Sequence, residues 1–221
     1  MNDKGKFMLT TFSIVVGASH HNPTLLNPDF LRTQISVLGG VEVDNVITTP
    51  PFSLVKYKNG LSITVEPEKL QVLQMMEGKS PEESLVPEVT SRYVETLPHV
   101  KYTAVGINWI GYVKQDNPAA WIRGRFLANG AWSHKPYDVA AMGIRLSYNV
   151  DGGKCNLAIS DGQVRKNEQA PFAAMNINAN YHHDLEDKYP NDKEVVGIIN
   201  KWSDRRKHFE KLLVDVLDLE Q

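Results

Sequence analysis

Two pairs of adjacent histidines carry the side chains of this sequence that are best suited to hold a metal ion. His20 and His21 follow the first apolar run of the chain, and His182 and His183 follow a late one, with Asp184 directly after them. Imidazole nitrogens and carboxylate oxygens bind zinc and iron. The groups would converge if both strand ends met at one sheet edge, although adjacent residues of an extended chain point to opposite faces. The alternative is that these polar residues only close strands before loops.

A second set of residues would suit a nucleic-acid-binding face on the predicted strands. Aromatic rings on a sheet can stack on bases, and cationic side chains can contact phosphates. The formal net charge of −2, from 24 basic and 26 acidic residues, gives no general attraction to nucleic acid or to an anionic membrane. The same aromatics are also common in cores. The residues of this candidate face are Lys56, Lys58, Trp109, Tyr112, Arg145, Tyr148 and Asn178, with Tyr57, Arg165, Lys166, Asn176 and Asn180 beside them.

No other catalytic arrangement is recognisable in the sequence. Gly152-Gly153 precedes a strand-like segment, whereas a phosphate-binding loop must open a helix. Cys155 is the single cysteine, which excludes an intramolecular disulfide and a cysteine-rich zinc site, and no Cys-His signature surrounds it. We therefore expect a buried thiol, no cofactor and a binding or assembly protein. A metal-dependent enzyme built on the histidine pairs is the alternative.

A long amphipathic helix is predicted from about Asp192 to Leu219. Apolar residues recur along it at spacings of three and four, and a helix of that length would span roughly 42 Å. It would either lie across a sheet as the main core helix or partly overhang and pack on another subunit. The residues of the possible interface are Trp202, Arg205, Arg206, Phe209 and Leu213.

The elements that would position these residues follow one order twice. In residues 1–100, a strand (Phe7–Ala18) precedes a helix that Asn27-Pro28 starts and Gly39 ends. Strands then follow at 41–48, 52–58, 61–66 and 70–76, with an Asn59-Gly60 hairpin turn, before a helix at about 88–97. In residues 101–221, a strand (101–113) precedes a helix from Asn117-Pro118 to Gly130, strands at 138–150, 154–160 and 172–181, and the final helix.

The spacing of these signals predicts a duplication. Asn27 lies 32 residues before the Asn59-Gly60 turn, and Asn117 lies 34 residues before the Asp151-Gly152 turn. We expect an α+β protein in which two β-α-β-β-β-α halves, 1–100 and 101–221, form one fused unit. Its curved antiparallel sheet would carry helices on one face. This order resembles the duplicated saddle of the TATA-binding-protein fold in topology, and such a likeness does not transfer function.

Three segments carry a resemblance to a known family. They are the run Leu61–Leu70, the run Leu97–Val113, and a late strand that ends in His-Asp before a terminal helix with His208-Phe209. Together they resemble a sporadically distributed family of uncharacterised bacterial proteins. The resemblance implies an accessory factor of a bacterial or phage system, but no activity.

The sequence as a whole thus predicts a partner-binding protein. We expect a protein partner, a homo-oligomer or both, with nucleic acid as the alternative ligand. Phe7–Ala18 is interrupted by Thr10, Thr11 and Ser13 and is typical of a strand, and no run approaches the roughly 20 apolar residues that span a bilayer. We expect no membrane association and a cytoplasmic location.

Overall fold

The computed structural model of the protein describes residues 5–137, 139–166 and 169–220. Within these ranges nine strands form one open antiparallel sheet in the order β2-β3-β4-β5-β1-β6-β9-β8-β7. The strands are β1 (Phe7–Ala18), β2 (Val43–Thr49), β3 (Phe52–Tyr57), β4 (Leu61–Glu66), β5 (Lys69–Met75), β6 (Tyr102–Lys114), β7 (Gly143–Val150), β8 (Gly153–Val164) and β9 (Phe172–Asp184).

The long strands β1 and β6 pair at the centre of the sheet. Outward from β1 lie β5, β4, β3 and β2, and outward from β6 lie β9, β8 and β7, so each side is built from consecutive strands. The predicted turns close two of the hairpins, with Gly60 at φ 85° between β3 and β4 and Gly152 at φ 70° between β7 and β8. Glycine tolerates this left-handed backbone without a Cβ clash.

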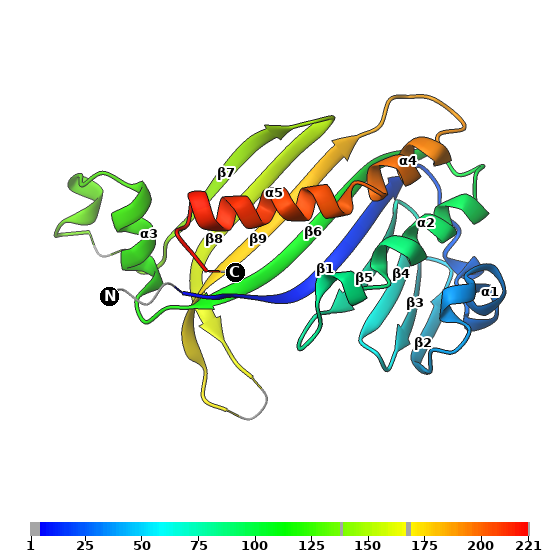
Figure 1. The fold of residues 1–221 in the computed structure, drawn as a ribbon, viewed down its shortest axis with the longest axis horizontal. Coiled ribbons are helices and arrows are strands. Elements are labelled where there is room, and N and C mark those ends of the chain that lie inside the picture. The colour runs from blue at the N-terminus through cyan, green and yellow to red at the C-terminus, as the bar shows by residue number, and fades with distance from the viewer. Residues whose placement is uncertain (1–4, 138, 167–168, 221) are drawn as a thin grey trace.

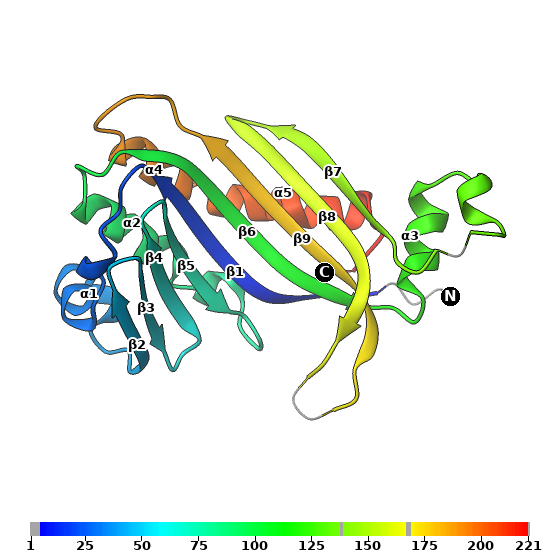
Figure 2. The ribbon, with the colours of Figure 1, turned by 180° about the vertical axis from the view of Figure 1, so that it is seen from behind.

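Helices cover one face of the sheet. The helices α1 (Pro28–Gln34), α2 (Val86–Thr96), α4 (Asp192–Ile199) and α5 (Trp202–Asp215) lie on that face, and α3 (Pro118–Phe126) lies beyond one end of β7, β8 and β9 (Figures 1 and 2). The predicted helix starts are confirmed, because Asn27 Oδ1 accepts from the Phe30 N–H at 2.9 Å and Asn117 Oδ1 from the Ala120 N–H at 3.0 Å. These side chains satisfy N–H groups that have no partner within the helix.

An aromatic stack joins α5 to the sheet. The Trp109 ring on β6 lies parallel to Phe12 on β1 with centroids 5.4 Å apart, and its edge contact with Tyr181 on β9 also measures 5.4 Å. Phe209 of α5 stacks on Trp109 at 6.0 Å. All four side chains are buried, so the middle of the core lies between β1, β6, β9 and α5.

The predicted single C-terminal helix is wrong in one respect. The chain turns at Asn200 and Lys201, so α4 ends at Ile199 and α5 begins at Trp202. The turn lets α4 pack against α2 and β6, while α5 crosses the central strands (Figure 1). Past α5 the chain is no longer helical, and the Glu220 N–H donates to the Gly5 carbonyl.

Other boundaries also differ from the prediction. α1 ends at Gln34 and not at Gly39, and β8 continues past Ser160 to Val164. β9 continues to Asp184, so His182 and His183 lie within the strand and do not follow it. α3 ends at Phe126, before Gly130. β7 begins at Gly143, and Asp138, the predicted start of that strand, lies outside the described residues. Within the described ranges, the helices are all too short or too polar to cross a bilayer.

Candidate functional site

The face of the sheet opposite the helices carries a row of amide and hydroxyl side chains. Successive strands place Ser13, Asn108, Asn180, Asn156 and Ser147 opposite one another, from β1 across β6, β9 and β8 to β7. Asn180 Nδ2 donates to Asn108 Oδ1 at 2.6 Å, and Ser147 Oγ donates to Asn156 Oδ1 at 2.9 Å. We call these five residues the amide row. Its members bond to one another and still offer free donors and acceptors.

A shallow hollow of 330 Å³ lies along the amide row. All three asparagines of the row line the hollow, together with Ala158, Asn178 and Arg145. Asn178 and Arg145 are exposed and lie on the next row of the same face, opposite Ala158 on either side. The hollow therefore presents uncharged hydrogen-bonding groups with one cation at its rim.

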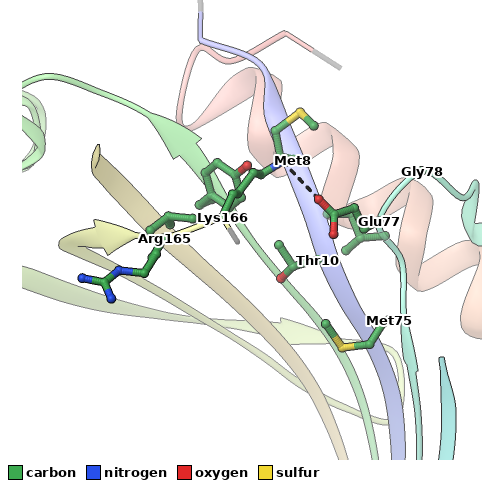
Figure 3. Close-up of a pocket in the computed structure, with 10 residues that line it drawn as sticks. Met8, Thr10, Met75, Glu77, Gly78, Arg165 and Lys166 are labelled. Atoms are coloured by element: carbon green, nitrogen blue, oxygen red, sulfur yellow. Dashed lines mark ion pairs between the residues drawn. The ribbon is translucent and has the colours of Figure 1, made fainter. Parts of the chain in front are cut away.

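A second recess of 250 Å³, which we call the methionine pocket, lies on the same face where β1 and β5 meet the distal end of β8 (Figure 3). Met8 and Met75 supply apolar surface and are 43 % and 49 % exposed. Exposed thioether side chains are flexible and polarizable, so they adapt to differently shaped apolar groups. Such a pocket suits an apolar side chain of a ligand.

An ion pair and a cation–aromatic contact close one side of the methionine pocket. Lys166 Nζ lies 3.3 Å from Glu77 Oε1 and 5.8 Å from the centre of the Tyr112 ring (Figure 3). The interactions with Tyr112 and then with Glu77 raise the pKa of Lys166, so the ammonium stays charged. Tyr112 is buried beneath it and against Phe172, with ring centroids 5.7 Å apart.

One cross-strand row connects the two recesses. It runs from Met75 on β5 through Thr11 and Ile110 to Asn178, Ala158 and Arg145 on β7. Five strand spacings of about 4.8 Å make this row roughly 24 Å long, which matches about seven residues of extended polypeptide. Ile110 in the middle is itself 39 % exposed. The face thus combines an apolar pocket, an apolar centre and a polar hollow along one line.

The structure does not bring the two histidine pairs together as a metal site. His182 lies on the open face, 3.0 Å from Asp184, whereas the His183 ring turns to the other face and contacts the Gly152 carbonyl at 2.9 Å. His20 is exposed, but His21 is buried beside the rings of Tyr93 and Tyr102. Across the described ranges, no group of three or more His, Cys, Asp or Glu residues is placed to hold a metal.

The predicted nucleic-acid face is wrong for its aromatic residues. Trp109 and Tyr57 are buried on the helix-covered face, and Tyr148 lies on that face opposite the buried Cys155. Tyr112 does lie on the open face, but it is only 5 % exposed.

The predicted cations of that face have mixed positions. Lys56 lies 3.7 Å from Asp44, and Lys58 pairs with Glu42. Arg145, Asn178 and Asn180 line the hollow, and Arg165 and Lys166 line the methionine pocket. A stacking platform for bases is therefore missing from the described part of the open face.

The α5 residues predicted for a subunit interface mostly serve the protein's own fold. Phe209 and Leu213 are buried against the sheet, and Trp202 packs on Phe12 with centroids 5.8 Å apart. Arg205 is 8 % exposed and donates to the Asp151 carbonyl, and Arg206 donates to Glu210 at 2.6 Å. The overhanging-helix interpretation is wrong for these positions.

Sequence reasoning missed the methionine pocket. Its walls come from the start of β1, the end of β5, β6 and the end of β8, and no local pattern links these segments. The alternation of asparagines in β9 was a visible signal for the hollow, but Asn108 and Asn156 join it only through strand register. No protein-family model matches the chain, and no curated protein matches it.

Proposed function

We propose that this is a non-enzymatic binding protein that holds an extended segment of a protein partner on the open face of its sheet. The observation that carries the proposal is the row from Met75 to Arg145, which joins an apolar pocket to an amide-lined hollow. An apolar side chain of the partner would enter the methionine pocket, and backbone amides nearby would bond to Asn178 and the amide row. Amide side chains can both donate to and accept from a peptide group.

The charge and the aromatic positions favour a protein over a nucleic acid. Stacking surfaces for bases come from exposed rings, and the rings of Trp109, Tyr57 and Tyr148 lie on the other face. Arg145 is the cation at the hollow, and Lys166 is already paired with Glu77. With Arg165 at the methionine pocket, the described part of this surface has one such cation near each end of the row, which suits a carboxylate or carbonyl group of a peptide better than a row of phosphates.

The arrangement of the strands supports a related proposal about origin. We infer that residues 1–100 and 101–221 arose by duplication, because β1 and β6 pair at the centre and each is flanked by the later strands of its own half. Each of the two strands is also followed by a helix with an asparagine N-cap. The halves then differ in one strand and in their final helices, so the open face is not expected to bind identically on both sides.

A selection from random displayed peptides tests the binding proposal. Peptides of about seven to twelve residues would be selected on the intact protein, because the row accommodates about seven extended residues. We expect enriched peptides with a large apolar residue. Their affinity, measured by fluorescence polarisation, should fall by about tenfold or more in Met75→Glu, where a charge replaces apolar pocket surface.

The matched control is Val214→Glu. Val214 is 41 % exposed on α5 and belongs to the opposite side of the molecule, so this variant should bind like the wild type. Failure to enrich any peptide, or equal affinity of enriched peptides for wild type and Met75→Glu, would overturn the proposal. Tighter binding of a single-stranded oligonucleotide that Met75→Glu does not affect would instead assign the face to nucleic acid.

A further inference from the structure

Strand β7 forms an uncovered edge of the sheet. It is the last strand in the sheet order, and no described segment lies along its outer side (Figures 1 and 2). The bond just before β7 shows which of its backbone groups are free. The Asp161 N–H donates to the Met142 carbonyl, and hydrogen-bonded pairs alternate along an antiparallel ladder, so the even-numbered residues of β7 bond to β8. The N–H and C=O groups of Arg145, Ser147 and Asn149 therefore point away from the sheet.

The two edges of the sheet are not equally protected. At the opposite edge, β2 contains a bulge between Val43 and Asn45, is followed by Pro50-Pro51, and has the Thr48 hydroxyl bonded to the Leu26 carbonyl. Bulges, prolines and covering loops are the usual devices that stop a strand from pairing with another chain. β7 has none of them: its register with β8 is continuous over eight residues, it has no proline, and Arg145 is its one charge.

The side chains of β7 are also arranged for pairing with another strand. Ile144, Leu146, Tyr148 and Val150 point to the helix-covered face and are only half-buried, whereas Arg145, Ser147 and Asn149 point to the open face. An added strand would extend the apolar row on one face and the polar row on the other. The occupant must therefore have the same alternation, which β7 itself has.

We propose that two copies of this protein pair through β7, antiparallel and across a two-fold axis. Residues that oppose each other in the two strands must point to the same face of the sheet. Two registers that overlap most of β7 meet this condition and also keep Arg145 from facing Arg145 of the second copy. In one, Ser147 faces Ser147 and Arg145 faces Asn149; in the other, Leu146 faces Leu146 and Arg145 faces Ser147. In both, apolar residues oppose apolar residues. The two sheets become one, and their open faces continue across the axis.

The partner is a second copy because β7 is complementary to itself. A heterologous edge pairing would leave β7 of one molecule free and could continue into a filament, whereas β7–β7 pairing closes after two copies. The inference does not depend on the peptide-binding proposal, since it uses backbone groups at the sheet edge and not the methionine pocket.

Sedimentation equilibrium over the micromolar concentration range tests the pairing. We expect a dimer for the wild type and a monomer for Ser147→Pro. Proline at residue 147 removes an outward N–H and no backbone bond to β8. It also removes the exposed hydroxyl bond from Ser147 to Asn156, which is a small loss, so folding should be retained while pairing is blocked. Ser147→Lys is the second disrupting variant, because it places like charges on or beside the axis. Ile47→Lys changes a 41 % exposed residue of the other edge strand and should leave the dimer intact.

Cysteine cross-linking tests the register under mild oxidation. Directly opposed residues of a hydrogen-bonded antiparallel pair have Cα atoms about 5.5 Å apart, which a disulfide can bridge. Ser147→Cys should form a covalent dimer in the first register, and a mixture of Arg145→Cys with Ser147→Cys should form the mixed dimer in the second. Cys155 is fully buried and should not compete. A monomeric wild type, or a dimer whose mass both β7 variants leave unchanged, would overturn the proposal.

Discussion

The hydroxyl of Tyr181 lies 2.6 Å from Nδ1 of His208, which ties β9 to α5 within the core. Burial raises the pKa of Tyr181 far above its ordinary value of 10, so the phenol keeps its proton and can donate. Burial, followed by the charges of Arg205 and Lys211, lowers the pKa of His208, so its ring is neutral and can accept. The two shifts favour the same pair of protonation states.

Removing either partner of this bond should destabilise the protein. In His208→Leu, the buried Tyr181 hydroxyl loses its acceptor, and we expect the free energy of unfolding to fall by about 1–3 kcal/mol. Urea denaturation gives the value. The double variant His208→Leu, Tyr181→Phe should lose less than the sum of the two single variants, because neither polar group is then left alone. Additive losses would show that the contact contributes nothing.

The buried ring of His21 predicts that stability falls in mild acid. Burial lowers the pKa of His21 from 6.5 to about 4, since the charged ring is disfavoured among Tyr93 and Tyr102. Its unfolded form binds a proton more readily than its folded form. The stability that the neutral His21 ring contributes is therefore fully present above pH 6.5. As the pH falls toward 4, the free energy of unfolding should decrease by at most about 3 kcal/mol.

Thermal denaturation across this pH range would measure the effect. His21→Leu keeps apolar packing and removes the titrating group, so its stability should decline less between pH 6.5 and 4 than that of the wild type. Part of the decline should persist, because burial also lowers the pKa values of His183 and His208. The exposed neighbour supplies the control, and His20→Leu should retain the wild-type slope. Parallel curves for His21→Leu and the wild type would contradict the assignment.

Two glycines should respond oppositely to substitution by alanine. A Cβ at Gly111 on β6 would lie 2.3 Å from the Met8 carbonyl oxygen and 2.5 Å from the Phe7 ring, so the backbone of β1 would have to shift. We expect Gly111→Ala to lower the free energy of unfolding by about 3 kcal/mol, even if the two strands adjust in part. A Cβ at Gly124 in α3 meets nothing within 4 Å, and Gly124→Ala should stabilise by about 0.5–1 kcal/mol. Urea midpoints in opposite directions would confirm both.

Local signals in the sequence located most of the elements. The Asn27 and Asn117 caps, the Asn59-Gly60 turn and the Asp151-Gly152 turn act over a few residues, and each is found where the sequence placed it. The turn at Asn200-Lys201 was missed because neither proline nor glycine marks it, and the apolar stripe continues from α4 into α5.

The face of each strand was less predictable. Alternation divides a strand into two sides, but it does not say which side the helices cover. Alternation alone therefore assigns Trp109 and Tyr148 to a ligand-binding face, whereas Trp109 is the centre of the aromatic stack. The hollow was still less accessible, because Asn108 and Asn180 are neighbours only through the β6–β9 register. Pairing between residues 72 positions apart follows from the whole topology and has no local pattern.

The amide row should separate into structural and ligand-contacting asparagines. Asn180 donates to Asn108 at 2.6 Å and is half-buried, whereas Asn178 is exposed and lines the hollow. We expect Asn180→Ala to lower the free energy of unfolding by about 0.5–1.5 kcal/mol, since Asn108 loses a donor. Asn178→Ala should change the free energy of unfolding by less than about 0.5 kcal/mol, as exposed substitutions do. It should lower the affinity for any peptide that is selected on the open face. Urea denaturation and fluorescence polarisation measure the two effects. If Asn178→Ala and the wild type bind the peptide equally, the hollow is not part of the binding surface. Asn178 lines the hollow and lies midway along the row from Met75 to Arg145, so a bound peptide would have to contact it.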